Sequence, residues 1–197
     1  MNKFSLDTNS SIEWLEAGKI LVHPTESIWG LGCDAFNENA VNLIFKIKKR
    51  NKNKSFILLI KSLESFQKYL ENIKEIDKKY LSQFWPGPYT FLIRYNDKLP
   101  AHLKNNTGKI ALRVSNHLPT RQLFMAYNGY IVSTSANISG KDNLDDPNEI
   151  INFFEYDEIA YYDEILGKNI TPSKIIDLES RTVISCLLYT SPSPRDA

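Results

Sequence analysis

The chain has 197 residues, of which 42% are hydrophobic and 24% are charged, and its formal net charge at pH 7 is +1. This composition is typical of one globular domain and excludes a uniformly basic nucleic-acid binder, so a site for an anion has to be local. The longest strongly apolar run, FILLI at 56–60, is much shorter than a membrane span, and the N-terminal stretch lacks the apolar segment of a secretory signal. We therefore expect a cytoplasmic protein. The two cysteines and three histidines have neither disulfide-framework nor metal-ligand spacing, which predicts no built-in metal site.

Hydrophobic periodicity predicts helices and strands that interleave along the chain. In chain order we expect a helix at 10–17, a strand at 19–23, a helix at 37–50, a strand at 55–60, helices at 62–70 and 74–85, strands at 89–95 and 109–115, a helix at 119–127, a strand at 130–136, a helix at 146–154 and a strand at 173–178. Ser10 or Ser11 is the expected cap of the first helix, Gly18 its end, and Pro119 opens a later helix.

Because the expected elements follow no strict βαβ repeat, they favour a single α/β domain with one twisted mixed sheet over residues 1–184. The last stretch, CLLYTSPSPRDA, loses the Lys and Asn bias of the rest and gains Ser-Pro pairs. Residues 185–197 are therefore expected to be a non-native or disordered tail.

The segment KIKKRNKNK at 46–54 gathers six cations in nine positions without an acid. A lysine-rich helix end is favourable with the helix dipole and is usually solvated, which is one interpretation. The cations continue beyond the helix, however, and Lys48, Arg50 and Lys54 are spaced so that they can converge on one polyanion such as a triphosphate.

A second segment, HPTESIWGLGCDA at 23–35, carries a strand into Pro24 and then Thr25, before two glycines. The strand end is where α/β sheets tend to place ligands, and Gly30 and Gly32 allow a close backbone approach or a positive φ. The segment lacks the GK[ST] of a P-loop and the GxGxxG fingerprint, and the alternative is a tight turn. Glu26 is either catalytic or, as is more usual for a lone carboxylate after a threonine, a helix cap.

The third segment is VSTSANISGK at 132–141, where an expected buried strand delivers short hydroxyls and one amide within seven residues: Ser133, Thr134, Ser135, Asn137 and Ser139. Such groups can donate to an anion, or else bond their own backbone in a turn. The sequence shows no Ser-His-Asp triad, paired carboxylates or nucleophilic Cys, and Cys33 is predicted to serve packing.

Six motifs occur together in one order: HPTESIWGLGCDA, IKKRNKNKSFILL, WPGPYTFLI, IALRVS, VSTSANISG and PSKIID. Over about residues 10–180 the chain resembles the Sua5/YrdC/TsaC family of threonylcarbamoyl-AMP synthases. The resemblance implies a twisted α/β fold of the single-domain YrdC-like type with a positively charged concave face. It also implies a nucleotidyltransferase that joins L-threonine, bicarbonate or CO2, and ATP with Mg²⁺ into threonylcarbamoyl-AMP, which feeds the t6A modification of tRNA at position 37.

The resemblance also implies roles for individual residues. The KxR and SxN motifs of the family fall on Lys48, Arg50, Ser135 and Asn137, which would hold ATP together with Lys54 and Ser133, and the first two would be catalytic. Thr25, Arg113 and Ser173 match positions for threonine, and Thr90 lines the same cavity. Asn51 stands where the family often has Pro, which leaves the roles of the charged groups intact.

Two alternatives stay open at this stage. The basic cavity could belong to an RNA-binding module that grips tRNA or double-stranded RNA, whose binding would weaken steeply with salt. The chain could also be related to the carbamoyl-transfer domain of hydrogenase maturation proteins, although the accompanying acylphosphatase and zinc-finger-like regions are lacking. Under the main interpretation the partners are the substrates, tRNA and the proteins that transfer the t6A group, with no membrane.

Overall fold

The computed structural model describes residues 4–51, 55–138, 143–168 and 174–186. The strands are β1 (Ser5–Leu6), β2 (Ile20–Pro24), β3 (Trp29–Asp34), β4 (Ile57–Leu59), β5 (Tyr89–Arg94), β6 (Lys109–Arg113), β7 (Ile131–Ser135), β8 (Ile159–Tyr162), β9 (Lys174–Asp177) and β10 (Val183–Cys186). The helices are α1 (Thr8–Glu16), α2 (Glu38–Ile47), α3 (Leu63–Phe66), α4 (Glu75–Leu81), α5 (Leu118–Ala126) and α6 (Pro147–Phe154), with short 3-10 turns η1 (Gln67–Tyr69) and η2 (Ala101–Leu103).

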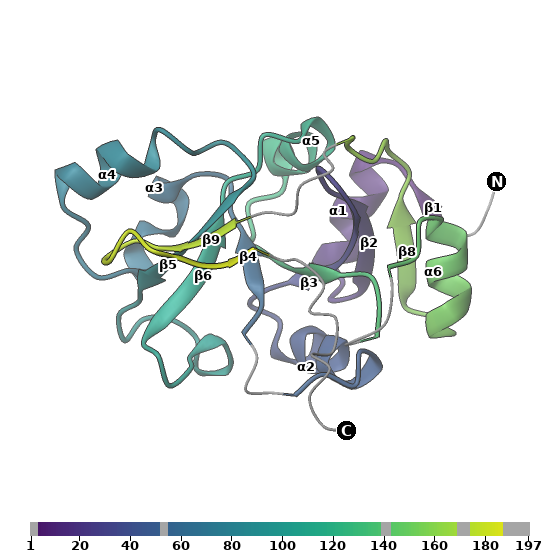
Figure 1. Ribbon diagram of the computed structural model, residues 1–197. Coiled ribbons are helices and arrows are strands. Elements are labelled where there is room, and N and C mark those ends of the chain that lie inside the picture. The colour runs from purple at the N-terminus through teal and green to yellow at the C-terminus, as the bar shows by residue number, and fades with distance from the viewer. Residues whose placement is uncertain (1–3, 52–54, 139–142, 169–173, 187–197) are drawn as a thin grey trace, which may run out of the picture.

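Within these residues the strands form one ten-stranded sheet in the order β1-β8-β2-β3-β7-β4-β6-β5-β9-β10 (Figure 1). Parallel and antiparallel pairs both occur: β2 is parallel to β8 and antiparallel to β3, and β5 is parallel to β9 and antiparallel to β6. The expected α/β class with a single mixed sheet is confirmed.

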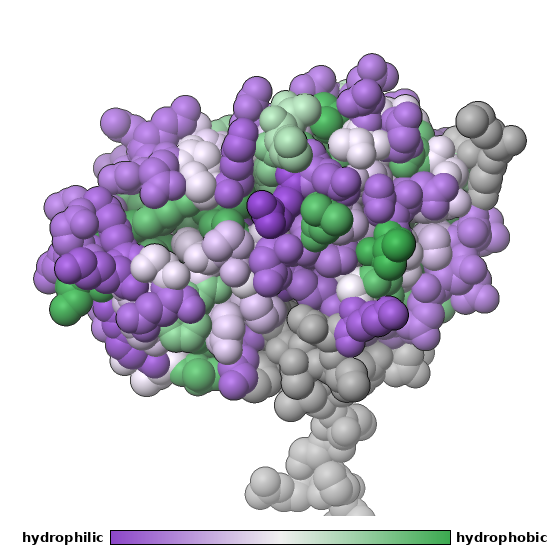
Figure 2. Space-filling model, turned by 90° about the horizontal axis from the view of Figure 1, so that it is seen from above, coloured by the Kyte–Doolittle hydropathy of each residue, from purple (hydrophilic) through white to green (hydrophobic). Residues whose placement is uncertain are grey.

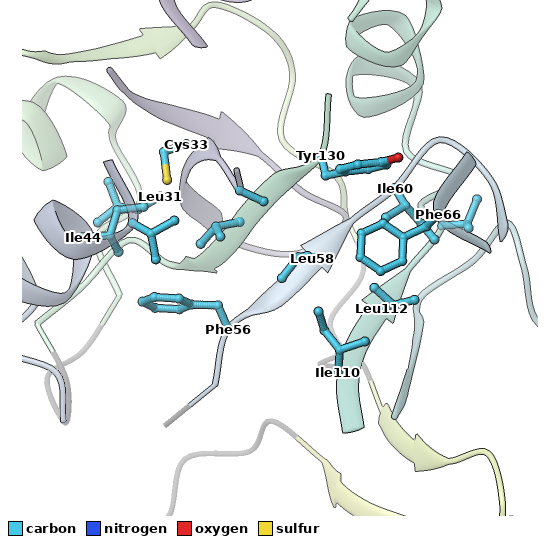
Figure 3. Close-up of a cluster of buried hydrophobic side chains, with 14 of the residues drawn as sticks. Leu31, Cys33, Ile44, Phe56, Leu58, Ile60, Phe66, Ile110, Leu112 and Tyr130 are labelled. Atoms are coloured by element: carbon cyan, nitrogen blue, oxygen red, sulfur yellow. The ribbon is translucent and has the colours of Figure 1, made fainter. Parts of the chain in front are cut away.

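The two faces of the sheet pack against different helices. Leu58, Leu112 and Val132 are paired across adjacent strands and therefore share one face, where Ile44 of α2 and Phe66 of α3 join them in the main core (Figure 3). On the opposite face, Leu21, Leu59 and Ile131 pack with residues of α1 and α5 in a second cluster. These two helices lie side by side over this part of the sheet (Figure 1).

Every helix and strand expected from the sequence is present, with bounds that are shifted or in most cases shorter, but several details differ. The cap of α1 is Asp7, whose carboxylate accepts from the Ser10 amide, so the expectation of a Ser10 or Ser11 cap is wrong. Gly18 ends this helix with a positive φ of 74°, as expected. Strands β1, β3, β8 and β10 were not predicted.

The segment expected to be a glycine turn is the strand β3, hydrogen-bonded to β2 on one side and β7 on the other. Gly30 and Gly32 keep extended backbone; the described glycines with positive φ are Gly18 and Gly108. A side chain at either position would meet the His23 ring of β2, and at Gly32 also atoms of Ile131 and Val132.

Strand β10 ends at Cys186, two residues beyond the expected limit of the domain at 184, and the remaining expected tail lies outside the described residues. In the view that looks down on α5, hydrophobic residues form separate spots among hydrophilic ones (Figure 2), which is normal for a protein surface. No helix in the described ranges is long and apolar enough to cross a membrane.

Candidate active site

Polar residues from strands β7, β6 and β5 share the sheet face that α1 and α5 cover only in part. Ser133 of β7 and Ala111 of β6 both pair with Ile57 of β4, so Ser133 and Ser135 lie on the same face as Arg113, two residues beyond Ala111. Leu92 of β5 also pairs with Ala111, which places Thr90 on this face opposite Arg113. Strand spacing puts β7 and β6 about 10 Å apart. We call this the site face.

The Lys48 ammonium joins the end of α2 to the end of β7. Its Nζ donates to the Ser135 and Asn137 carbonyl oxygens, each at 2.5 Å, and to Asn137 Oδ1 at 3.2 Å. Ser135 Oγ donates to the same Oδ1 at 2.6 Å. The structure thus brings three residues of the predicted nucleotide set into one cluster from two distant parts of the chain.

Lys48 is only 1% exposed, which contradicts the alternative interpretation of a solvated helix end. Burial, and then the neighbouring Arg50, lower the pKa of Lys48 to about 7, whereas the three oxygen acceptors favour its charged form. An ammonium has three donors, and here they serve the 135–137 turn. Lys48 therefore fixes the shape of the 135–137 turn and makes the electrostatic potential at this turn more positive.

Arg50 lies just beyond this cluster. Its Nη2 donates to the Ser55 carbonyl at 2.9 Å, and its guanidinium lies over the Phe56 ring at 5.1 Å from the centroid. Burial lowers the pKa of Arg50, but guanidinium groups stay charged in proteins. A guanidinium can donate two parallel hydrogen bonds to the oxygens of a phosphate group.

The two glycines of β3 make room for a buried histidine. A Cβ at Gly30 would lie 2.7 Å from His23 Nε2, and a Cβ at Gly32 would lie 3.0 Å from His23 Cδ2. His23 Nε2 is 3.2 Å from Ser133 Oγ, and Nδ1 is 3.3 Å from the Pro24 carbonyl. These contacts fit a neutral ring that donates from Nδ1 and accepts from Ser133. Burial lowers the pKa of His23 to about 4.

Glu26 forms a buried ion pair with Arg113, and the interpretation of Glu26 as a helix cap is wrong. Glu26 Oε2 is 2.5 Å from Arg113 Nη2, and Oε1 accepts from Ser115 Oγ at 2.6 Å. Glu26 and Arg113 are 6% and 8% exposed. The sequence interpretation preferred a cap to a catalytic role for Glu26, and it missed His23 as a site residue. The signal that could have found them is the position of HPTE at the end of a strand.

Two further predicted residues differ in what they can offer a ligand. Thr25 Oγ1 donates to the Ile28 carbonyl at 2.7 Å and accepts from the amides of Ser27 and Ile28, so its hydroxyl closes a turn. Thr90 is fully buried, and its Oγ1 has no partner in the part of the chain that the structure describes. Lys54, Ser139 and Ser173 lie outside the described residues.

Cys33 is completely buried among hydrophobic residues, as predicted, and burial raises the pKa of its thiol. A hollow of about 250 Å³ lies elsewhere, between the outer side of α2 and η2, and none of the predicted site residues lines it. The candidate site is therefore defined by converging polar groups on an open face.

Comparison with known proteins identifies the family of the chain. Residues 13–186 match the model of the Sua5/YciO/YrdC family, which carries the description "Telomere recombination", and the chain belongs to this family. Among curated relatives, the threonylcarbamoyl-AMP synthase of Cellvibrio japonicus is 31% identical over 89% of this chain and 93% of its own length. That of Stutzerimonas stutzeri is 35% identical over 86% of this chain and 91% of its own length.

Solved structures give the same fold. The structure of P. abyssi Sua5 complexed with L-threonine superposes with a TM-score of 0.79 and 26% identity over 89% of this chain. The chain spans about half of that protein, 54% of its length. E. coli YciO matches with a TM-score of 0.79 over 93% of this chain and 94% of its own, at 24% identity, which supports the fold alone.

Proposed function

We propose that this protein is an L-threonylcarbamoyl-adenylate synthase. It would join L-threonine, bicarbonate or CO2, and ATP, and release pyrophosphate. The observation that carries the proposal is the cluster at the end of β7, where Lys48 at the end of α2 donates to the carbonyls of Ser135 and Asn137. The Ser135 side chain lies on the same face as Arg113. The names of the curated relatives support the same activity.

The reaction asks for positioning and charge stabilisation, which these residues can supply. The deprotonated amine of threonine adds to CO2 to give a carbamate. A carbamate oxygen then bonds to the α-phosphorus of ATP as the bond from that phosphorus to the bridging oxygen of pyrophosphate breaks. Negative charge grows on the phosphate oxygens, and Lys48 and Arg50 offset it; Ser133, Ser135 and Asn137 orient the nucleotide.

Mg²⁺ prefers oxygen ligands and is usually held through substrate phosphates, which suits a site of serine, threonine and asparagine oxygens. The described residues contain no group of three His, Cys, Asp or Glu side chains that could hold a metal ion. We propose that Mg²⁺ arrives on ATP and neutralises phosphate charge, with Lys54 as a further cation from outside the described ranges.

For threonine, we propose that Arg113 receives the carboxylate, with Ser173 in the same subsite. Thr25 would contribute by fixing the 25–28 turn, since its hydroxyl is already hydrogen-bonded within it. Thr90 would line the cavity opposite Arg113. The product would serve t6A formation in the cytoplasm, where the partners would be tRNA and the proteins that transfer the t6A group. The site would lie on a positively charged concave face.

Mass spectrometry tests the proposal with a mixture of the protein, ATP, Mg²⁺, threonine and bicarbonate, without RNA. We expect threonylcarbamoyl-adenylate, and its absence when threonine is left out. If no threonine-dependent adenylate forms, the proposed function is wrong. RNA binding that falls steeply between about 50 and 200 mM salt, without adenylate formation, would instead support an RNA-binding module.

A further inference from the structure

We infer that Glu26 is a positioning residue for threonine: it holds the Arg113 guanidinium in the orientation that receives the substrate carboxylate. The inference rests on the proposed function and assigns a task to a residue that the sequence interpretation treated as a helix cap. It stands on the contacts of both carboxylate oxygens and on a buried donor of Arg113 that these contacts leave unpaired.

Glu26 is fixed from three directions. Its Oε2 contacts Arg113 at 2.5 Å, and its Oε1 accepts from the Ser115 hydroxyl at 2.6 Å. Ser115 Oγ in turn accepts from the His117 amide at 3.1 Å. The backbone of Glu26 is covered by Gly167, where a Cβ would lie 2.4 Å from the Glu26 carbonyl oxygen. The Glu26 carboxylate is therefore held in one orientation, which sets the orientation of the Arg113 guanidinium.

The contact with Glu26 occupies Nη2 of Arg113, while Nε is buried and has no partner among the described residues. A buried donor without an acceptor costs about 1–3 kcal/mol, so its persistence points to a ligand oxygen. A guanidinium presents its N–H groups in a planar fork. By fixing one N–H of the fork, Glu26 fixes the direction in which the others point.

Two opposite effects of Glu26 on threonine affinity can be separated. If Glu26 only neutralised Arg113, it would compete with the substrate carboxylate, and removing its charge would strengthen binding. If Glu26 positions Arg113, removing its charge frees the guanidinium to turn, and binding weakens. The titratable groups that face the pair are His23 from β2 and His117 at the start of α5, and burial lowers the pKa of both imidazoles. Both imidazoles are therefore mainly uncharged at pH 7, and they add no charge beside the Glu26–Arg113 pair.

The test is a double-mutant cycle of Glu26→Gln and Arg113→Lys, with the KM for threonine, the KM for ATP and kcat measured at pH 7.5 by pyrophosphate release. We expect Glu26→Gln to raise the threonine KM about tenfold or more, the scale of a misoriented binding group, with the ATP KM unchanged within about twofold. In the Arg113→Lys background the same change should have little further effect, because Glu26 acts through Arg113. An unchanged or lower threonine KM in Glu26→Gln overturns the inference.

A matched control breaks a similar pair on the same strand. Lys109 Nζ is 2.6 Å from Asp177 Oδ2, with both side chains largely buried, at the opposite end of β6 from Arg113. Asp177→Asn should lower the melting temperature and leave the threonine KM unchanged. If Asp177→Asn raises the threonine KM as much as Glu26→Gln does, the effect is one of general stability and the inference is wrong.

A milder variant decides the question if Glu26→Gln does not fold. Ser115→Ala removes only the hydroxyl that holds Oε1, and it should raise the threonine KM several-fold with the ATP KM unchanged; no change would overturn the inference. Failure of the proposed function looks different, since the wild-type protein itself would then form no threonine-dependent adenylate.

Discussion

The buried imidazole of His23 makes the stability of this fold sensitive to mild acid. The ring is 3% exposed and lies in the space that Gly30 and Gly32 leave open. Its pKa is about 4 in the folded protein, against an ordinary value of 6.5. Between these values the unfolded chain binds a proton at His23 and the folded protein does not, so unfolding takes up a proton. Stability is therefore constant above pH 6.5 with respect to this group, and falls as the pH is lowered toward 4.

The size of the effect follows from the two pKa values. A tenfold difference in proton affinity is worth about 1.4 kcal/mol, so the full window from pH 6.5 to 4 removes roughly 3 kcal/mol of unfolding free energy. This is a large part of the 5–15 kcal/mol typical of a domain. The carboxyl pKa values of Asp177 and Glu179 are lowered by their contacts with cations, and they act at more acidic pH.

Urea unfolding at pH 7.5, 6.5, 5.5 and 4.5 measures this effect when the wild-type protein is compared with His23→Gln. The variant keeps a hydrogen-bonding group near Ser133 but does not titrate, and all other titrating groups are common to both proteins. We expect the wild-type advantage in unfolding free energy to shrink by about 2–3 kcal/mol between pH 6.5 and 4.5. If the two proteins lose stability in parallel, the assigned protonation of His23 is wrong.

The remaining predictions concern the same face. Gly30→Ala should lower the unfolding free energy by about 1–3 kcal/mol, measured by urea unfolding, because the new methyl group displaces the His23 ring; equal stability would contradict the reported packing. Lys48→Met should lower the melting temperature and abolish most adenylate formation, since the Ser135 and Asn137 carbonyls lose their donor; full activity would exclude Lys48 from the site. Arg50→Ala should slow pyrophosphate release, because about 3 kcal/mol of transition-state stabilisation is lost; a wild-type rate would refute the assignment of Arg50 to the site. In competition assays, serine should compete with threonine more strongly than 2-aminobutyrate does, because a missing methyl group is worth only about 1–3 kcal/mol whereas a missing hydroxyl leaves polar groups unpaired; the reverse order would exclude hydroxyl recognition.

Much of the fold could be predicted from periodicity, because most elements bury one face in the core. The amphipathic helix at 37–50 is α2, with Val41 and Ile44 buried as the pattern indicates. The strands that escaped prediction are short or atypical: β1 has two residues, and β3 contains two glycines. Their extended state is fixed by neighbours that are far away in the sequence, which local propensity does not register.

The sequence indicated three residues that meet at the end of β7, but not the contacts between them. Clustered charge and clustered hydroxyls pointed to Lys48, Ser135 and Asn137, since such groups gather where an anion binds. The burial of Lys48 was not predictable, because it depends on α2 ending beneath β7. Nor was the Glu26–Arg113 pair, which depends on how strands from distant segments align.

The order of the strands has a consequence for synthesis of the chain on the ribosome. The N-terminal strand β1 pairs only with β8 in the described sheet, so it has no partner until residues 159–162 have been made. At the other flank of the sheet, β5 cannot pair with β9 until residues 174–177 have been made. The two flanks of the sheet therefore close almost at the same moment, once residues 159–177 have been made. Until then the emerging polypeptide exposes unpaired edges that chaperones would recognise.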